Sequence, residues 1–322
     1  MFAIIAEKRY LWQKITSMVK QDEITLSKWI ENLQSRGRYA FSLSLLATEL
    51  PSYTEIAARS ALSRLTTKGK IISIYRSYYL IIPPQYSSKG ILPPALFMDG
   101  LMKNLQRPYY LGLLNAAGFY GASHQQPQEF FVVTNFPVLR TTQKKGLKIN
   151  YLSKKTIPET LLESKKTEAG YLKVSNPALT ACDLIQFEKR VGGINRVSTV
   201  LNELAEAIKP EMFNTELLAH VPVTALQRLG YILDAVLEND LLANALYKTI
   251  EQKEIAFFRT PLKTSSSVAG FPVNERWKVI LNTEVDTEFL GDITGLLRRE
   301  SNDTYNPQEA YEVVKKQLIE KI

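Results

Sequence analysis

Apolar residues recur at the spacing of a half-buried helix in two segments near the start of the chain. The first segment begins with Ser27, the expected N-cap, and ends near Gly37, where a glycine can leave the helix. The second begins with Ser42, again a favourable N-cap, and stops before Pro51, because proline interrupts a helix. The apolar positions are Trp29, Ile30 and Leu33 in the first segment and Leu43, Leu46, Ala47 and Leu50 in the second.

A third helix is predicted from Ser52 to Lys68, and its two faces differ in kind. Ser52 and Glu55 have the spacing of a capping box, and Gly69 follows as the expected C-cap. At about 3.6 residues per turn, apolar residues gather on one side and small hydroxyl residues on the other. The core-facing positions are Ala58, Ala61, Leu62 and Leu65, and the opposite positions are Ile56, Ser60, Ser63 and Thr67, flanked by Arg59 and Arg64.

Two strands joined by a basic turn follow the third helix. Lys70–Tyr75 and Tyr78–Ile82 are rich in β-branched and aromatic residues, and Arg76 and Ser77 form the tip of the predicted hairpin. Three helices followed by a hairpin are typical of a winged helix-turn-helix, whose third helix enters the major groove of DNA. The hairpin tip would then contact the DNA backbone or the minor groove. The sequence therefore predicts a DNA-binding domain over residues 27–84.

Beyond two proline pairs, Pro83-Pro84 and Pro93-Pro94, the chain becomes a longer mixture of helices and strands. The stretch between the pairs is expected to be a semi-rigid extended connector. Strands flanked by helices indicate a mixed α/β domain over residues 95–290, so the predicted fold class is α+β with an N-terminal winged helix. The expected helices are Leu96–Leu105, Tyr109–Tyr120, Asn176–Phe187, Ile194–Ile208 and two or three more in 212–252. The expected strands are Glu129–Thr134, Leu147–Leu152, Gly170–Val174, Ile255–Phe258 and Trp277–Asn282.

The two ends of the chain fall outside these domains. Residues 1–26 are an N-terminal extension, within which Met18 is an alternative start. Residues 291–322 are a polar tail, expected to end in a helix after Pro307. The apolar run at the N-terminus is too short for a secretory signal, and no run approaches the roughly 20 apolar residues that span a bilayer. A cytoplasmic protein without a membrane partner is therefore expected.

Composition favours a polyanionic partner and leaves little material for metal or redox chemistry. The 322 residues include 40 Lys and Arg against 32 Asp and Glu, a formal net charge of +8, and are enough for two domains. The single cysteine, Cys182, allows no internal disulfide, the two histidines are His124 and His220, and no metal or cofactor is expected. Charges within residues 27–82 include Arg36, Arg38, Arg59, Arg64, Lys68, Lys70 and Arg76 against Glu31, Glu49 and Glu55.

The third helix and the hairpin supply the candidate DNA contacts. Small hydroxyl residues let a helix approach base edges closely, and arginines reach guanine edges or phosphates. The alternatives are that the basic helix is a solvated face, or that the winged helix is a protein-interaction unit. The candidates are Arg38, Ser52, Tyr53, Thr54, Arg59, Ser60, Ser63, Arg64, Thr67, Lys68, Lys70, Arg76 and Tyr78.

The second domain offers few catalytic constellations. The chain contains neither Gly-x-x-x-x-Gly-Lys nor Gly-x-Gly-x-x-Gly. His124 lies in a polar loop and Cys182 on an amphipathic helix, where it is expected to be core. Asp99 and Asp183 lie on helices, where capping, a salt bridge or exposure explains an acid. Two predicted strands lack the acids that a restriction-type nuclease needs, so an enzyme is not expected, and a degenerate nuclease stays as an alternative.

Several phrases of the chain, in the right order, resemble the AbiEi antitoxins of abortive-infection, type IV toxin–antitoxin systems. The phrases are Tyr109–Tyr120, Ser175–Ile185, Gly192–Ala205, Gln227–Tyr231 and Asn274–Val279. The resemblance implies a transcriptional autorepressor that binds an operator inverted repeat in double-stranded DNA through its N-terminal winged helix. It also implies that the C-terminal domain counteracts a cognate nucleotidyltransferase-type toxin. The family has no catalytic residues to carry over.

The resemblance leaves two questions open. Members of the family include regulators without an assigned toxin, so a stand-alone winged-helix regulator is the alternative to an antitoxin. The oligomeric state does not follow from the sequence. A basic cluster in the second domain, Lys144, Lys145 and Lys148, is expected to be a solvated loop rather than a contact site.

Overall fold

The computed structural model describes residues 25–122 and 129–285, which divide into two compact units. Unit 1 comprises Met1–Pro108, Arg140–Ile149 and Lys165–Leu172, and unit 2 comprises Tyr109–Leu139, Asn150–Ser164 and Lys173–Ile322. Helices and sheets are both present, in agreement with the predicted α+β class. Met18, His124 and the helix predicted after Pro307 lie outside the described residues.

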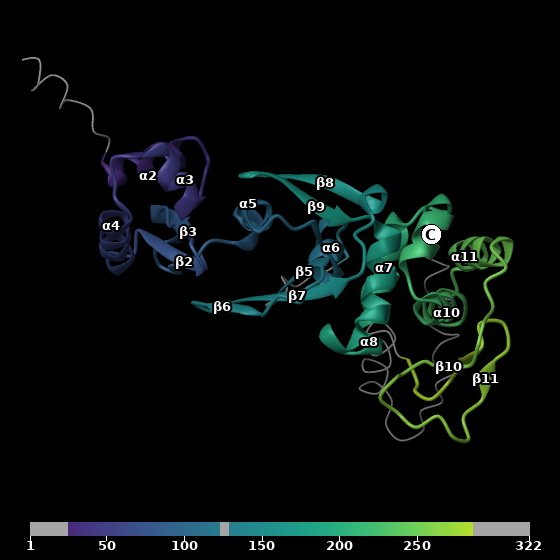
Figure 1. Ribbon diagram of the computed structural model, residues 1–322. Helices are drawn as coiled ribbons and strands as arrows, with labels where there is room; N and C mark the ends of the chain where they lie inside the picture. Colours follow the sequence, from purple (N-terminus) through teal and green to yellow (C-terminus); the bar gives the residue numbers. More distant parts are fainter. Residues whose placement is uncertain (1–24, 123–128, 286–322) are drawn as a thin grey trace, which may run out of the picture. The chain divides into compact units, whose positions relative to one another are not determined.

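Residues 25–82 fold into three helices and a three-stranded antiparallel sheet (Figure 1). The sheet order is β1-β3-β2, with Phe41 opposite Tyr79 and Ile72 opposite Leu80. The elements in chain order are α2 (Leu26–Ser35), β1 (Ala40–Ser42), α3 (Leu43–Glu49), α4 (Glu55–Thr67), β2 (Ile71–Tyr75) and β3 (Tyr78–Ile81). Three helices and a hairpin thus occur where they were predicted, and β1, between the first two helices in the chain, adds a third strand.

The first helix starts earlier than predicted. Its N-cap is Thr25 rather than Ser27, and the Thr25 hydroxyl accepts a hydrogen bond from the backbone N–H of Lys28 at 3.3 Å. The earlier start adds Leu26 to the buried stripe, three residues before Trp29 on the same face. Thr25 and Ser27 are both favourable N-cap residues, and the start at Thr25 is favoured because it buries Leu26 as well.

The start of α4 also differs from the prediction. Thr54, in extended conformation, is the N-cap and accepts a hydrogen bond from a backbone N–H of the first turn at 3.3 Å. Ser52 lies outside the helix in a turn, and the Glu55 carboxylate binds Arg59 instead of a capping residue. The predicted capping box is therefore wrong, although Gly69 follows the helix with φ 69°, as a glycine at that position should.

The second helix, α3, buries less of its stripe than predicted. Ser42 is its N-cap, as expected, and accepts from the backbone N–H of the third residue on at 3.1 Å. Leu46 and Leu50 are buried, but Leu43 is half-buried and Ala47 is exposed. The helix has only 7 residues, and Leu50 already follows it as the C-cap. The Leu50 side chain is therefore buried from a position just after the helix, and not as part of the helical stripe.

The three helices and the small sheet enclose one hydrophobic core. Phe41 lies edge-on to Trp29, with ring centroids 5.1 Å apart, and stacks on Tyr79 at 5.5 Å. The indole N–H of Trp29 donates to the Glu49 carboxylate at 2.8 Å. The predicted inner face of α4 is confirmed, since its buried residues are Ala58, Ala61, Leu62 and Leu65.

The connector after β3 is folded rather than extended. Two 3-10 helices, η1 (Pro84–Tyr86) and η2 (Pro94–Leu96), precede α5 (Met98–Asn104). Between η1 and η2 along the chain, Ile91 and Leu92 are buried. Their burial fixes the path of the chain, so the prediction of a semi-rigid extended connector is wrong.

A six-stranded mixed sheet has the order β6-β7-β5-β4-β9-β8. β4 pairs antiparallel with β5 and parallel with β9, and β6 pairs antiparallel with β7. The strands are β4 (Tyr109–Leu111), β5 (Glu129–Asn135), β6 (Thr142–Lys144), β7 (Leu147–Lys154), β8 (Leu162–Thr167) and β9 (Gly170–Ser175). β5, β7 and β9 were predicted from their composition, whereas the short or polar strands β4, β6 and β8 were not.

The prediction of one helix over Tyr109–Tyr120 is wrong. Tyr109–Leu111 is strand β4, and the helix α6 spans only Leu113–Phe119. All three side chains of β4 are buried, because the strand lies between β5 and β9, so it has no polar face that would reveal a strand period. Gly112 marks the break, since a Cβ there would lie 3.1 Å from the Val133 side chain.

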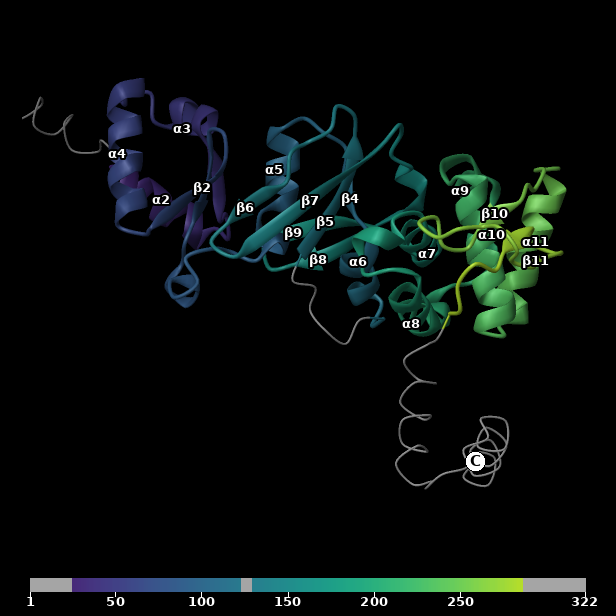
Figure 2. The ribbon, with the colours of Figure 1, turned by 90° about the horizontal axis from the view of Figure 1, so that it is seen from below.

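In unit 2, helix α7 (Pro177–Gln186) packs against α6, α8 and α10 (Figure 2). Asn176 caps α7 and Pro177 is its first residue, as predicted. The helix predicted to run to Ile208 ends at Leu204. The other helices are α8 (Ile194–Leu204), α9 (Thr215–His220), α10 (Val223–Tyr231), the π-helix η7 (Ile232–Val236) and α11 (Asp240–Gln252). The 3-10 helices are η3 (Glu159–Leu161), η4 (Glu188–Arg190), η5 (Ala205–Ala207) and η6 (Pro210–Met212).

The last strands differ from the prediction in place and length. Ile255–Phe258 is not a strand, and the Phe258 carbonyl accepts a hydrogen bond from the Gln227 side chain at 2.8 Å. A small sheet of order β10-β12-β11 forms farther along, parallel between β10 and β12 and antiparallel between β11 and β12. Its strands are β10 (Thr260–Pro261), β11 (Val273–Asn274) and β12 (Val279–Ile280).

Contacts of Trp277 hold the segment with β10, β11 and β12 against α10 and η7. Its ring lies against Gly230 so closely that a Cβ on that glycine would lie 2.1 Å from a ring carbon. Its indole N–H donates to Asp234 of η7, and its carbonyl accepts from Gln227, both at 2.8 Å. Two of the phrases noted in the sequence, Gln227–Tyr231 and Asn274–Val279, therefore meet at one buried tryptophan.

We predict that Gly230→Ala destabilises the chain by about 1–3 kcal/mol, because the added methyl forces Trp277 out of its place. Gly118→Ala in α6 is the matched control, since no atom lies within 4 Å of its Cβ position. Alanine there should leave the stability equal or higher by up to about 1 kcal/mol. Urea denaturation of the two full-length variants measures both values, and equal midpoints would contradict the packing described for Gly230.

Candidate nucleic-acid interface

The side of α4 that faces away from the core is exposed along the helix. It carries one large apolar residue in the first turn and small hydroxyl residues after it. The Thr67 hydroxyl donates to the Ser63 carbonyl at 3.1 Å, whereas the hydroxyls of Ser60 and Ser63 have no partner within the described residues. We call this surface the outer face of α4, and its exposed residues are Ile56, Arg59, Ser60, Ser63, Arg64 and Thr67. Its small side chains let another molecule approach the helix closely.

Arg59 is held by a neighbour on its own helix. Its Nε and Nη2 atoms both donate to Oε1 of Glu55, at 3.0 and 2.7 Å. Both side chains are largely exposed, and an exposed pair at this spacing is worth only about 0.3–0.5 kcal/mol. An incoming phosphate or base edge can therefore displace Glu55 from the guanidinium.

The remaining basic side chains around α4 are exposed and have no acidic partner among residues 25–122 and 129–285. Glu49 is occupied by the Trp29 indole and by Arg38, whose guanidinium lies 3.8 Å away. Within the part of the chain that the structure describes, no ion pair involves the other cations of residues 25–82. The exposed ones are Arg36, Arg64, Lys68, Lys70 and Arg76. A surface with unneutralised cations attracts a polyanion.

The tip of the β2–β3 hairpin presents Arg76. Ser77 takes a left-handed conformation with φ 58°, and its carbonyl accepts a hydrogen bond from the backbone N–H of Leu43 at 2.9 Å. The turn is therefore tied to the first residue of α3, while the Arg76 side chain stays exposed. A fixed turn with an exposed arginine suits a contact to a phosphate.

Two predicted contact residues have other tasks. Tyr78 is only 4% exposed, and its hydroxyl lies over α5, 2.6 Å from the Cβ position of Gly100. Burial, together with the Asp99 carboxylate, raises the pKa of Tyr78 well above its usual value. Tyr53 is half-buried, and its hydroxyl accepts from the backbone N–H of Leu26 at 3.1 Å. The contact assigned to Tyr78 is therefore wrong, and Tyr53 supports the start of α2.

The other predicted contact residues are accessible in the structure. Thr54 uses its hydroxyl oxygen as the cap of α4, and Arg38 is half-exposed beside Glu49. The structure therefore brings most of the predicted set onto α4, its two ends and the hairpin. The accessible residues are Arg38, Ser52, Thr54, Arg59, Ser60, Ser63, Arg64, Thr67, Lys68, Lys70 and Arg76.

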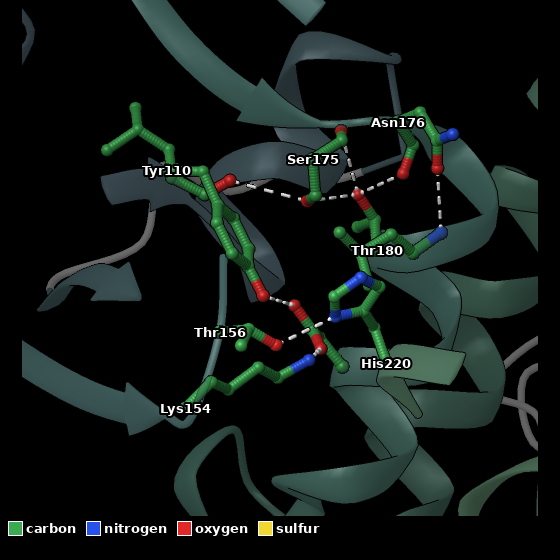
Figure 3. A network of polar contacts seen from close by, with 10 residues as sticks. Tyr110, Lys154, Thr156, Ser175, Asn176, Thr180 and His220 are labelled. Atoms are coloured by element: carbon green, nitrogen blue, oxygen red, sulfur yellow. Dashed lines mark hydrogen bonds and ion pairs between the residues drawn. The ribbon is translucent and has the colours of Figure 1, made fainter. Parts of the chain in front are cut away.

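A buried polar network in unit 2 was not predicted (Figure 3). Asp183 of α7 is fully buried, and its two carboxylate oxygens bind two side chains from the sheet. Tyr110 of β4 donates its hydroxyl hydrogen to Oδ2 at 2.7 Å, and the Lys154 ammonium of β7 binds Oδ1 at 2.5 Å. The structure thus couples α7 to two strands through one ion pair and one hydrogen bond in the core.

The sequence contains a signal for this network. Lys154 shares its strand face with Asn150 and Leu152, which are buried, and Asp183 stands within the apolar phrase of α7. A buried acid and a buried amine each need a partner of opposite charge, but neither position tells which residue that partner is. Capping, a salt bridge or exposure was expected for Asp183, and the salt bridge is found, with Lys154 in the core.

Other groups near α7 have structural tasks. Burial raises the pKa of the Cys182 thiol, and Asp183 raises it further, so the thiol stays protonated at neutral pH. Cys182 is a core residue, as predicted. His220 and Thr156 form a hydrogen bond at 3.0 Å between ring Nδ1 and hydroxyl, and Ser175 and Thr180 form one at 2.7 Å (Figure 3).

Metal ligands do not gather in the described parts of the chain. Across residues 25–122 and 129–285, no three His, Cys, Asp or Glu side chains lie close enough to hold an ion. Within the same residues, no helix has both the length and the hydropathy to cross a bilayer.

In the basic cluster of the β6–β7 hairpin, Lys144 and Lys145 are exposed and Lys148 is half-buried.

Residues 110–235 match the family model of the AbiEi antitoxin C-terminal domain. This match confirms the resemblance to AbiEi-type antitoxins. The fold is similar to a crystal structure of the RV2827C protein from Mycobacterium tuberculosis, with a TM-score of 0.57 and 18% sequence identity, covering 79% of this chain and 90% of that one. At this identity the likeness shows the fold alone. No curated protein matches the chain.

We predict that Asp183→Asn destabilises the chain by about 3–5 kcal/mol, because it leaves the Lys154 charge buried without its partner. Adding Lys154→Met should restore much of this loss, since the amide oxygen introduced at position 183 still accepts from Tyr110. Denaturation midpoints of both variants and of Lys154→Met alone test this. A double variant no more stable than Asp183→Asn would show that the ion pair does not control the stability.

Proposed function

Because residues 110–235 carry the AbiEi antitoxin C-terminal domain, we propose that the chain is the antitoxin and autorepressor of an AbiE-like toxin–antitoxin system. In this proposal residues 27–84 form a winged helix-turn-helix that binds an operator inverted repeat in double-stranded DNA. Residues 95–290 form the antitoxin domain, which counteracts a nucleotidyltransferase-type toxin. The protein acts by binding and not as an enzyme.

The two-sided character of α4 carries the DNA-binding proposal. One side of this helix is the core of residues 25–82, and the other is the outer face, with small hydroxyl residues between two arginines. In a helix-turn-helix the recognition helix enters the major groove, where its N-terminal residues contact base edges. Arg59 and Arg64 are the candidates for guanine edges or phosphates, and Ser60 and Ser63 for close approach.

The surroundings of α4 fit the same role. Lys68 and Lys70 follow the helix, and Arg76 stands at the tip of the hairpin that would form the wing. None of these three cations has an acidic partner within the described residues. Phosphate contacts by such side chains release counterions, so the affinity for DNA should fall steeply as salt rises.

Two acids noted in the sequence, Asp183 and Asp99, have structural roles. Asp183 is buried and held by Lys154 and Tyr110, so it cannot reach a substrate. Asp99 forms an ion pair with Lys103 at 2.7 Å, one helical turn away on α5. Both acids therefore have structural partners, and the antitoxin proposal needs no reacting group from either.

We predict that Arg59→Ala and Arg64→Ala each weaken binding to the operator by about 1–3 kcal/mol if they read base edges. Fluorescence anisotropy with a duplex from the promoter region of the chain's own gene, at two salt concentrations, gives the affinities. Arg64→Lys keeps the charge but loses the bidentate geometry, so a base contact predicts a loss close to that of alanine.

Arg259→Ala is the matched control, because Arg259 is also exposed but lies in unit 2, outside the proposed contact surface. It removes the same charge and should bind the duplex as the parent chain does. Unchanged operator affinity in a variant that lacks both Arg59 and Arg64 would reject the outer face of α4 as the DNA contact.

We also predict that the antitoxin activity is separable from DNA binding. The full-length Arg59→Ala, Arg64→Ala variant, expressed from an unrelated promoter, should still rescue growth from the toxin encoded by the adjacent gene. Colony counts on induction of the toxin measure the rescue. If the parent chain rescues and the variant does not, the two activities share a surface; if the parent chain fails, it is not the antitoxin of that toxin.

A further inference from the structure

The first turn of α4 exposes a large aliphatic side chain. Ile56 is the second residue of the helix and is 83% exposed, more than any other large hydrophobic residue among those described. The buried side of α4, made by Ala58, Leu62 and Leu65, points the opposite way. Ile56 therefore contributes nothing to the core of residues 25–82, and its side chain is available to a partner.

The position of Ile56 distinguishes it from an isolated apolar residue on a surface, which needs no explanation. It lies on one line with Ser60, Ser63 and Thr67, at intervals of four, three and four residues, so all four share one side of the helix. Arg59 stands beside this line, one turn from Ile56. An aliphatic group is thus placed at the start of a polar and basic strip.

We propose that Ile56 is a specificity-determining residue that contacts the C5-methyl group of a thymine in the major groove. The thymine methyl is the one apolar group that base pairs present there, and aliphatic side chains recognise it by contact. The inference rests on the proposed DNA binding through α4. It deepens that proposal, because it assigns one base of each half-site to a named side chain.

The geometry of the helix supports this assignment. The N-terminal residues of a recognition helix are those that reach base edges, and Ile56 is one residue from the N-terminus of α4. Ser60, one turn further on, has a small side chain and lets the helix approach the floor of the groove closely. Arg59 can bind a phosphate or a neighbouring guanine after release from Glu55, which fixes the register at which Ile56 meets the bases.

A thymine contact can be tested from both partners, because deoxyuridine is thymine without the methyl group. Duplexes bound by the full-length chain are first selected from a random pool, and each thymine of the selected site is then replaced singly by deoxyuridine. At the contacted position the replacement should weaken binding of the parent chain about fourfold, the effect of burying one methyl-sized group.

Ile56→Ala, combined with the deoxyuridine replacement, completes a double-mutant cycle. It should weaken binding to the thymine duplex by about fourfold or more, and the deoxyuridine replacement at the same position should then have no further effect. Ile56→Val should lie between alanine and the parent chain. Leu241→Ala, which truncates a side chain that is 68% exposed on α11, is the matched control and should bind as the parent chain does. Neither truncation should change the thermal midpoint, since both side chains are exposed.

The outcomes separate this inference from the proposed function. If no duplex is selected, the DNA-binding proposal fails and the thymine contact fails with it. If a duplex is selected but every deoxyuridine replacement weakens the parent chain and Ile56→Ala equally, only the thymine contact is overturned. A change in molar mass of Ile56→Ala in light scattering, without any coupling to deoxyuridine, would also overturn it and assign Ile56 to contacts between copies of the chain.

Discussion

The fully buried carboxylate of Asp183 is the constraint on which the arrangement of unit 2 depends. A fully buried carboxylate needs an opposite charge and hydrogen bonds, and Lys154 and Tyr110 supply them from two strands of the sheet. Since Tyr110 belongs to β4 and Lys154 to β7, these two contacts tie α7 to both strands at once.

The same region shows how a small residue admits a larger one. Gly112 ends β4 beside Asp183, with the carboxylate 3.5 Å from its Cβ position. At the other end of unit 2, Gly230 makes room for the Trp277 ring, and Trp277 in turn binds Asp234 and Gln227. The segment after α11 has strands of only two residues, so side-chain contacts of this kind, rather than a sheet ladder, hold it in place.

In residues 25–82, α4 serves the fold with one side only. Four apolar residues bury that side, whereas the polar contacts of the outer face, Arg59 with Glu55 and Thr67 with Ser63, stay within the helix. This division supports the DNA-binding part of the proposed function, because the side chains of Ile56, Ser60 and Arg64 form no hydrogen bond or ion pair within the described residues. Substitutions there can therefore test recognition without the change in stability that follows substitutions at Asp183 or Gly230.

The sequence by itself determined what local spacing encodes: the helices near residues 30, 45 and 60, the hairpin after them, the Asn176 cap of α7 and the inner face of α4. It also contained the phrases that resemble the AbiEi antitoxins, most of which lie within the residues that match the family model. Only the tertiary structure decided between Ser27 and Thr25 as a cap, because burial of Leu26 outweighs a capping preference. Only it made Tyr109–Leu111 a strand, buried Tyr78 and paired Asp183 with Lys154. Each of these depends on neighbours far away in the chain, and an apolar or charged residue carries no mark of the partner it will meet.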